Sequence, residues 1–200
     1  MAFEVELKAW LRQPEVIEAK AAQLGAFKGE TLKEDIYFRR RGEQTPVPAD
    51  RFRLRREGGR AIVNFKQEAI AGDVEVNDEV EFGVDDAHAF FQFADRFGFE
   101  PFVVKRKKSR VYRIERANVE LNEVEHLGHF IEIEILCDDE ALVPAARTEI
   151  ARLYHHLGLP PADLEPRRYI ELIQAAHPVQ YRFVNDPAMN WPFAEFPIQE

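Results

Sequence analysis

The sequence predicts an α+β protein, a closed eight-stranded antiparallel β-barrel with helices packed against its outside. Many short segments alternate apolar and polar residues with a period of two, which is typical of half-buried strands. Turn signals join most of these segments as hairpins, and one helix after the first strand and another in mid-chain interrupt them. Six or more segments carry ionisable residues along one side. An open sheet could leave these charges in water with helices on the apolar face, whereas closing the sheet would gather them inside.

Composition limits the class of protein before any motif is considered. The 200 residues can form one domain with a substantial core, since 46% of them are hydrophobic. A net charge of −9 argues against a nucleic-acid or anionic-membrane surface. The single cysteine, Cys137, suits a reducing compartment, and neither a leader nor an apolar run of about 18 residues is evident. We therefore expect a cytoplasmic protein with no nucleic-acid and no membrane partner.

The first half of the chain supplies the first strands and two helices. Residues 3–8 alternate, with Glu4, Glu6 and Lys8 on the polar side, and a helix is expected at 14–24. The segments expected to follow are strands at 26–40, 51–55, 61–66 and 74–82 and a helix from Asp85, as its cap, to about Phe97.

The second half continues the sheet and adds two helices. The expected segments are strands at 102–116, 118–122 and 128–135 and helices at 144–157 and 166–176. Within the first of these strands, Lys105, Lys107 and Ser109 share one face. The tail has four prolines among aromatic residues and no clear period, so we expect a surface strap or a partner contact. The predicted division is a domain at 1–176 and a tail at 177–200.

Closing the sheet would bring acidic and basic residues from distant segments into one lumen. Such charges are costly to desolvate unless they are paired or the site is liganded. Crowded carboxylates favour a hard divalent cation such as Mg²⁺ or Mn²⁺, whereas Arg and Lys favour phosphate oxygens. A phosphate chain would satisfy both sets, as in phosphoryl transfer or pyrophosphate departure. The residues expected in the lumen are Glu4, Glu6, Arg53, Arg55, Lys66, Glu79, Glu81, Lys107, Glu132 and Glu134.

Ordered motifs on the predicted strands carry a resemblance to a known family. The residues concerned are Glu4, Glu6 and Lys8 of an ExExK motif, Arg53 and Arg55 of an RxR motif, Lys66 on the next strand, Glu79 and Glu81 of an ExE motif, and Gly128, Phe130, Glu132 and Glu134 of a GxFxExE motif. In this order they resemble the CYTH domain, or triphosphate tunnel metalloenzymes, which include class IV adenylyl cyclases, thiamine triphosphatases and tripolyphosphatases. The stretch from Asp35 and residues 165–169 are most similar to the class IV cyclase branch.

The resemblance implies an eight-stranded tunnel that holds a small triphosphate, such as ATP or tripolyphosphate, together with Mg²⁺ or Mn²⁺. It implies that Lys8 and Glu6 are catalytic and, because family members are often dimers, that the chain forms a homodimer. The residues implied to bind the triphosphate are Lys8, Arg53, Arg55, Lys66, Lys105, Lys107 and Arg167. The residues implied to bind metal are Glu4, Glu6, Glu79, Glu81, Glu132 and Glu134.

Three positions depart from the family pattern. Ser109 stands where the K-x-R pattern has arginine, so either a bulge brings Lys105 or Arg110 into the lumen or a phosphate contact is lost. Asn122 replaces an aspartate, and Arg39 replaces the aspartate that often ends the DxYFD stretch. These changes would weaken metal binding, alter the substrate or leave a binder without catalysis.

Four hypotheses about function follow from these residues. The first is an enzyme that converts ATP to cyclic AMP and pyrophosphate, and the second is a triphosphatase in which water attacks instead. The third is a polyphosphate- or nucleotide-binding module without turnover. The fourth is a structural barrel with an idle charged interior, which would be less stable without a ligand.

Overall fold

The structure is a computed structural model that describes residues 3–71, 74–184 and 191–197, without the side chains of 66–71 and 74–79. Within this part of the chain, the α+β class and the eight-stranded antiparallel sheet are confirmed. The strands of this sheet are β1 (Phe3–Trp10), β2 (Ala26–Arg40), β3 (Phe52–Glu57), β4 (Arg60–Ala71), β5 (Val74–Val84), β6 (Phe99–Ile114), β7 (Ala117–Val124) and β8 (Gly128–Cys137). The α-helices are α1 (Pro14–Leu24), α2 (Ala87–Arg96), α3 (Val143–Leu157) and α4 (Tyr169–Ala176).

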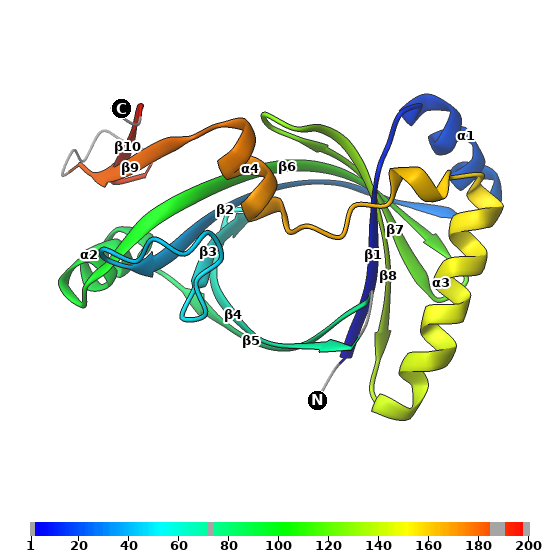
Figure 1. Cartoon of the computed structure of the whole chain (residues 1–200), viewed down its shortest axis with the longest axis horizontal. Coiled ribbons are helices and arrows are strands. Elements are labelled where there is room, and N and C mark those ends of the chain that lie inside the picture. Colours follow the sequence, from blue (N-terminus) through cyan, green and yellow to red (C-terminus); the bar gives the residue numbers. More distant parts are fainter. Residues whose placement is uncertain (1–2, 72–73, 185–190, 198–200) are drawn as a thin grey trace.

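The pairing of the strands brings the two ends of the sheet together. The hydrogen-bonded order is β1-β5-β4-β3-β2-β6-β7-β8, and β1 pairs with β5 on one side and with β8 on the other. The order therefore returns to its first strand, and Figure 1 shows the strands curving around a common interior. Side chains that point inward from distant segments can meet there.

The two longest strands, β2 and β6, hold the middle of the sheet. They have 15 and 16 residues and pair from Ala26 opposite Arg113 to Arg40 opposite Phe99. The register shifts twice, and one shift lies beside Gly29, whose φ of +126° favours glycine at such an irregularity. Between the shifts the register is regular, and Asp35 lies opposite Lys105.

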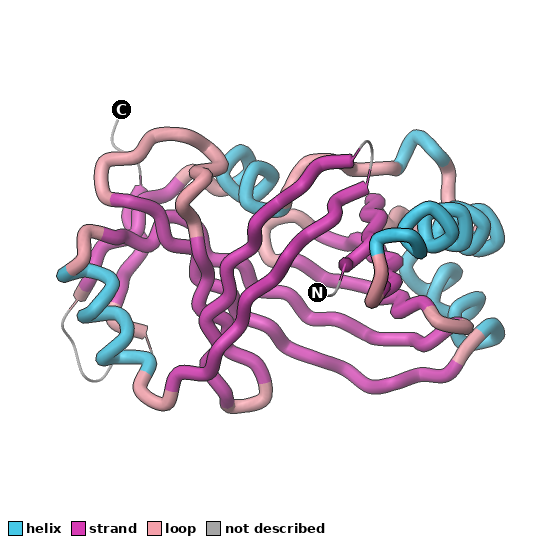
Figure 2. Tube along the Cα trace, turned by 90° about the horizontal axis from the view of Figure 1, so that it is seen from below, coloured by secondary structure: helices cyan, strands magenta, loops and turns pink. Residues whose placement is uncertain are grey.

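Alternation along the strands decides which side chains face the helices. Val5 and Ala9 of β1 are fully buried in one apolar cluster with Ile17 of α1 and Ile150 of α3. Figure 1 shows α1 and α3 beside β1, β7 and β8, and Figure 2 shows helices outside the strands at both ends of the molecule. The polar residues between Val5 and Ala9 therefore face the interior of the sheet.

A second cluster lies on the outer side of β2 and β3 and includes α2. Phe91 of α2 is fully buried, and its ring lies 5.3 Å from that of Phe38 of β2. The helix begins one residue later than expected, because Asp86 rather than Asp85 is the cap and accepts a hydrogen bond from the Ala89 amide at 2.9 Å.

The C-terminal segment forms a two-stranded antiparallel sheet of β9 (Val179–Phe183) and β10 (Phe193–Pro197). Tyr181, Trp191 and Phe193 are buried in the cluster around α2, and the Arg56 guanidinium lies 3.8 Å above the Trp191 ring. Neither strand is predicted from the sequence, because the prolines hide any period. The division into a domain at 1–176 and a tail at 177–200 stays a prediction.

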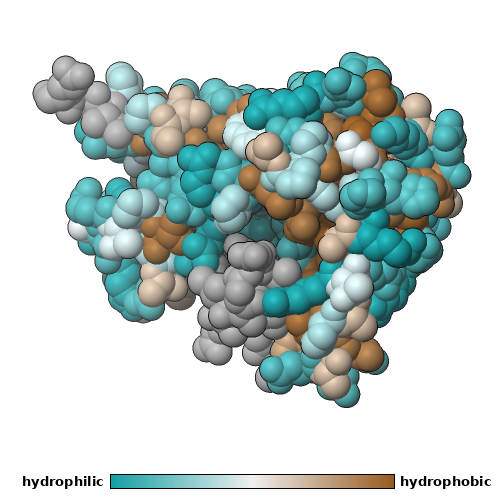
Figure 3. Space-filling view, turned by 45° about the vertical axis from the view of Figure 1, so that its right-hand side comes forward, coloured by the Kyte–Doolittle hydropathy of each residue, from teal (hydrophilic) through white to brown (hydrophobic). Residues whose placement is uncertain are grey.

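The outer surface is mixed in character. Figure 3 shows a face on which hydrophilic residues predominate and hydrophobic residues form smaller groups. Among the described residues, no helix combines the length and the apolar character that crossing a bilayer requires.

Candidate functional site

The interior of the sheet contains a cavity of about 220 Å³ whose wall is mostly polar and charged. Because inward-facing residues of distant strands converge here, the cavity combines residues from nearly the whole chain. Its ionisable wall residues are Glu4, Glu6, Lys8, Lys33, Tyr37, Arg51, Arg53, Arg55, Glu81, Lys105, Lys107, Glu120, Glu132, Glu134, Arg168 and Tyr169.

One side of the cavity is organised around the buried carboxylate of Asp35. Its side chain is 0% exposed and lies 2.8 Å from the Lys105 ammonium and 3.8 Å from the Arg53 guanidinium. Arg55 donates two hydrogen bonds to it, at 2.7 and 3.0 Å. Burial alone would raise the pKa of Asp35, but these three cations hold that pKa well below its ordinary value. We call these four residues the Asp35 cluster.

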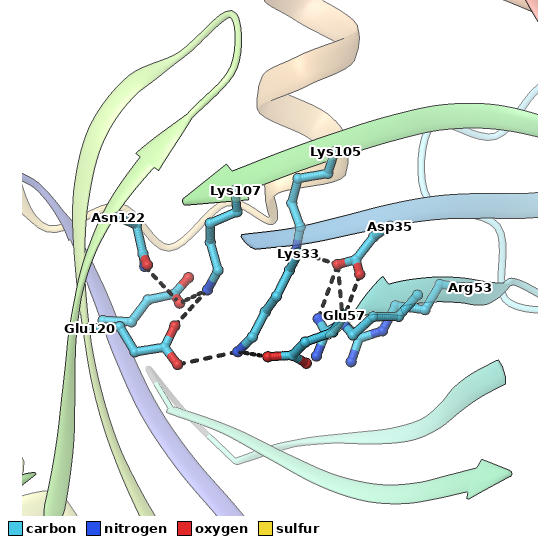
Figure 4. A network of polar contacts seen from close by, with 10 residues as sticks. Lys33, Asp35, Arg53, Glu57, Lys105, Lys107, Glu120 and Asn122 are labelled. Carbon is cyan, nitrogen blue, oxygen red and sulfur yellow. Dashed lines mark hydrogen bonds and ion pairs between the residues drawn. The ribbon is translucent and has the colours of Figure 1, made fainter. Parts of the chain in front are cut away.

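The other side has the opposite arrangement, with one buried ammonium between two carboxylates. Lys107 donates to Glu120 at 2.8 Å and to Glu132 at 2.6 Å, and Asn122 also donates to Glu132, at 2.9 Å (Figure 4). Burial alone would raise the pKa of Glu132, but the Lys107 charge holds that pKa below its ordinary value. Lys33, at 3.3 Å from Glu120 and 4.0 Å from Glu57, lies between the two sides. We call Lys107, Glu120, Glu132 and Asn122 the Lys107 cluster.

Glu134 lies farther along β8 and has a different environment from Glu132. Burial and the negative charges of Glu4 and Glu120 raise the pKa of Glu134 to about 7. The acidic side of the cavity therefore carries more negative charge than its own lysines neutralise.

The two residues expected to be catalytic lie at β1 and line the cavity. Lys8 donates a hydrogen bond to the main-chain oxygen of Arg167, and its ammonium lies 4.5 Å from the centre of the Tyr169 ring. Glu6 pairs in register with Glu134 of β8, as Glu4 does with Leu136. Glu4, Glu6 and Lys8 thus share one wall, although Lys8 is held by the segment before α4.

The expected triphosphate contact of Arg167 is not supported by its position. Its guanidinium donates to Glu165 at 2.8 and 2.6 Å, is 57% exposed, and is not part of the cavity wall. Glu165 also accepts from the Trp10 indole at 3.0 Å, so it is fixed in place and holds Arg167 outside. The neighbouring Arg168 lines the cavity instead.

Three of the predicted site residues, Lys66, Glu79 and Glu81, lie on β4 and β5, where some side chains are not described. The side chains of Lys66 and Glu79 lie outside the described residues, although their backbones are paired with each other. The Glu81 side chain is described, lines the cavity and accepts a hydrogen bond from Asn64 at 3.0 Å.

Ser109 raised the question of whether a bulge brings Lys105 or Arg110 into the lumen. No bulge is needed for Lys105 to reach the cavity, since β6 is regular there and Lys105, Lys107 and Ser109 point the same way. Arg110 points outward, with its guanidinium 2.7 Å from Glu18 of α1. Ser109 is fully buried opposite Asn122, and Arg39 pairs with Glu100 at 3.0 Å outside the cavity.

The roles of Lys33, Asp35 and Glu120 in the site are not predicted from the sequence. Each lies on a predicted strand, and alternation with Tyr37 or Asn122 could have indicated a shared face. Isolated charges on a strand are usually solvated, so this signal is weak without knowledge of the pairing.

The carboxylates of the cavity supply oxygen ligands of the kind that Mg²⁺ and Mn²⁺ prefer. Among the side chains described, no group of three His, Cys, Asp or Glu is arranged as a ready-made metal site. Mg²⁺ usually binds one or two carboxylates and takes its other ligands from water and substrate phosphates. The donor set therefore fits a metal that arrives with an anionic ligand.

The fold and the site together define an antiparallel-sheet protein with an ionised interior divided into a basic and an acidic side. The chain belongs to the CYTH domain family, which matches residues 2–169. The identification made from the ordered motifs, including its closeness to the CyaB-like class IV cyclase branch, is thereby confirmed.

Two of the similar proteins are more than 25% identical to this chain, and a third is similar in structure at lower identity. Adenylate cyclase CyaB of Aeromonas hydrophila is 27% identical over 177 residues, which cover 86% of this chain and 89% of that protein. The PH1819 protein of Pyrococcus horikoshii OT3 has a TM-score of 0.74 at 28% identity, covering 86% of this chain and 98% of that chain. HpAC1 of Hippeastrum, described as having a dominant triphosphatase activity, has a TM-score of 0.62 at 14% identity, covering 88% of this chain and 96% of that chain. This last likeness shows a common fold alone.

Proposed function

We propose that this protein binds the triphosphate of ATP in its cavity with Mg²⁺ or Mn²⁺ and converts ATP to cyclic AMP and pyrophosphate. The observation that carries this proposal is the separation of charge in one cavity, with the Asp35 cluster on one side and Glu4, Glu6, Glu132 and Glu134 on the other. The name of the Aeromonas hydrophila relative, an adenylate cyclase, supports the choice of reaction.

The basic side would bind the phosphate chain. Arg53, Arg55 and Lys105 converge on the Asp35 carboxylate, and all three also line the cavity. Arg binds phosphate oxygens through its planar fork and Lys binds them as a point charge. Lys66 would add to this side, Lys107 would reach the phosphate chain from the Lys107 cluster, and Arg168 replaces Arg167 in the proposal.

The acidic side would hold the metal. Glu4, Glu6, Glu132 and Glu134 would supply oxygen ligands, with Glu79 and Glu81 as further acidic groups. The raised pKa of Glu134 reflects uncompensated carboxylates, which a divalent cation would stabilise in their ionised form. When bound, the metal would neutralise charge on the phosphate chain.

In the proposed reaction, the ribose 3′ oxygen forms a bond to the α-phosphorus of ATP. The bond from that phosphorus to the bridging oxygen breaks, and pyrophosphate leaves with the electron pair. The 3′ proton leaves to a carboxylate such as Glu6. Lys8, whose ammonium lies at the cavity wall, would stabilise charge on the phosphates.

A second candidate is hydrolysis of a triphosphate. It is favoured by Glu134, because a carboxyl whose pKa is raised to about 7 suits removal of a proton from water near neutral pH. In this case water attacks phosphorus, and orthophosphate is released in place of cyclic AMP.

One assay separates these reactions. The protein is incubated with ATP, tripolyphosphate or thiamine triphosphate, with Mg²⁺, Mn²⁺ or chelator, and the products are separated by ion exchange. Cyclic AMP with pyrophosphate supports the first reaction, and orthophosphate supports the second. Metal-dependent binding without product would indicate a binding module and contradict both.

Variants test whether the cavity is the site. Glu6→Gln removes a carboxylate charge with little change in shape, and we expect kcat/KM to fall about 100-fold or more. The matched control is Glu115→Gln on the outer surface, where the side chain is 59% exposed and pairs with Arg152. Equal activity of the two variants would exclude the cavity as the active site.

A further inference from the structure

A second cavity, of about 530 Å³, lies where β2 ends and β6 begins, between these strands, α4 and β9. Both α4 and β9 contact β6, and Figure 1 shows them one after the other along it. Among the described residues, none lines both this second cavity and the cavity inside the sheet. Its volume is within the range of small-molecule sites, so it can hold a ligand of its own.

Three arginines from separate segments line the second cavity. They are Arg39 of β2, Arg41 of the following turn and Arg182 of β9, whereas Glu100 is the one carboxylate among the described lining residues. The wall therefore has a positive formal charge, although that of the whole chain is −9. Gathering like charges opposes folding unless counter-charges or a ligand offset their repulsion.

Two neighbours on β6 hold Arg39 in place. Its Nε donates to Glu100 at 3.0 Å, and its guanidinium lies 5.4 Å from the centre of the Phe102 ring. Phe102 is buried and is the extra residue of β6 at the register shift opposite Tyr37 and Phe38. A guanidinium has five N–H donors, so these contacts orient Arg39 and leave donors for a ligand. The position that departs from the DxYFD pattern thus belongs to the second cavity.

Arg41 is oriented from outside the second cavity. Its Nη2 donates to the Asp95 carboxylate at 2.6 Å and to the main-chain oxygen of Asp95 at 3.1 Å. Asp95 belongs to α2 and does not line the second cavity. Arg41 is therefore pre-organised, which lowers the entropic cost of binding an anion.

The facing wall comes from residues beyond the family match, which ends at residue 169. At the end of α4, the Gln174 amide donates to the main-chain oxygen of Pro46 at 2.7 Å. His177 Nε2 lies 2.5 Å from a carboxylate oxygen of Glu195 of β10. These contacts join the C-terminal segment to the loop after β2 and to β10, so Arg182 is part of a wall that the fold supports.

We infer that the second cavity binds a phosphate monoester of about the size of a nucleoside monophosphate, with its phosphate group among Arg39, Arg41 and Arg182. A phosphate monoester has a charge of about −2 and three terminal oxygens, so it can engage three guanidiniums. A carboxylate has one charge and two oxygens, which suit a single guanidinium fork.

The rest of the wall suits the organic part of such a ligand. Ile173 and Val179 supply apolar surface, and Gln44 and Gln180 supply amide groups that can donate or accept hydrogen bonds. The inference does not depend on which reaction takes place inside the sheet, because the two cavities have separate walls.

Titration calorimetry with chelator present tests the inference, with AMP, inorganic phosphate and succinate as probes. Chelator removes the divalent cation proposed to act inside the sheet. AMP should bind, and inorganic phosphate should compete with it. Succinate, a dianion with carboxylates alone, should bind at least about tenfold more weakly than AMP. Absence of AMP binding at about 1 mM, or succinate binding as tightly as AMP, overturns the inference.

Arg182→Gln locates the binding site, because this exposed side chain lines the second cavity alone. We expect the Kd of AMP to rise about tenfold or more, with an unchanged Tm. The matched control is Arg60→Gln at the start of β4, which is also exposed and lines neither cavity, and it should retain the wild-type Kd. Lys8→Gln, inside the sheet, should retain it too. A Kd that Arg182→Gln leaves unchanged overturns the inference, and a rise in Lys8→Gln would then place AMP inside the sheet.

Discussion

The Asp35 cluster and the Lys107 cluster have opposite arrangements of charge and are neighbours in the wall of one cavity, since Lys105 and Lys107 are two residues apart on β6. In the first, the buried Asp35 carboxylate contacts Arg53, Arg55 and Lys105. In the second, the buried Lys107 ammonium contacts Glu120 and Glu132, and Lys33 also contacts Glu120. The cations of the first cluster and the carboxylates of the second all line the cavity. The cavity is thus basic on one side and acidic on the other.

The two clusters differ in how they can respond when the central charge is removed. Carboxylates can become neutral by binding a proton, and their pKa rises when they are buried together. An arginine has a pKa above about 12 and stays charged under all ordinary conditions. Loss of the central charge should therefore lower the free energy of unfolding more in the Asp35 cluster than in the Lys107 cluster.

The largest expected effect is that of Asp35→Asn. This variant leaves Arg53, Arg55 and Lys105 without their shared carboxylate, and we expect the free energy of unfolding to fall by about 3–5 kcal/mol. Denaturant unfolding at pH 7 measures the loss. The matched control is Asp50→Asn, in an exposed pair with Arg40 at 3.1 Å, which should change stability by no more than about 0.5 kcal/mol. Similar losses in the two variants would show that Asp35 does not organise the basic side.

Lys107→Met should have a smaller effect that depends on pH. The methionine keeps the length of the side chain, but Glu132 loses its ion pair with Lys107, and Glu120 keeps its contact with Lys33 at 3.3 Å. We expect a loss of about 2–3 kcal/mol in the free energy of unfolding at pH 8. At pH 5 the loss should be smaller, because the crowded carboxylates of the variant bind protons as the pH falls. Unfolding of the wild type and variant at both pH values measures the difference.

A surface pair of equal length serves as the control for Lys107. Arg152 lies 2.6 Å from Glu115, the same distance as Lys107 from Glu132, but its side chain is 53% exposed. Arg152→Ala should change the free energy of unfolding by no more than about 0.5 kcal/mol, since solvent screens the pair. A loss as large as that of Lys107→Met would mean that burial is not what separates the two pairs.

The smallest expected effect is that of Glu134→Gln, measured with chelator present. The folded-state pKa of Glu134 is raised to about 7, so between its ordinary pKa of about 4.3 and pH 7 the folded chain binds more protons than the unfolded chain. Stability due to this group therefore falls as the pH rises through that range. The variant should be about 1–2 kcal/mol more stable than the wild type at pH 8, with no gain at pH 4. A difference that does not change with pH would contradict the raised pKa.

Much of the cavity is predictable because strand alternation is a local property of the sequence. Glu4, Glu6, Arg53, Glu132 and Glu134 are all expected to face one lumen, and all of them line the cavity. Period-two alternation assigns each residue to a face without knowledge of the strand order. The family motifs strengthen the expectation, since they occur in order on the predicted strands.

The arrangement of the chain is least predictable where the sequence has no local period. Arg167 and Arg168 are adjacent in an extended segment, and only the contacts of Glu165 with Trp10 and β1 decide which of them reaches the cavity. The pairing of β9 with β10 is also non-local, and the prolines of the tail give no alternation that could predict it.

The sequence by itself determined the class of fold, the segments that become strands and the charges that face inward, because these depend on short-range periodicity. The tertiary structure decided how those charges are grouped. Asp35, Arg53, Arg55 and Lys105 meet only because β2 pairs with both β3 and β6, and Tyr169 reaches the cavity only because the segment before it is tied to β1. Ion pairing at a buried site depends on distances of a few ångströms between residues far apart in the chain, and only the packed sheet sets those distances.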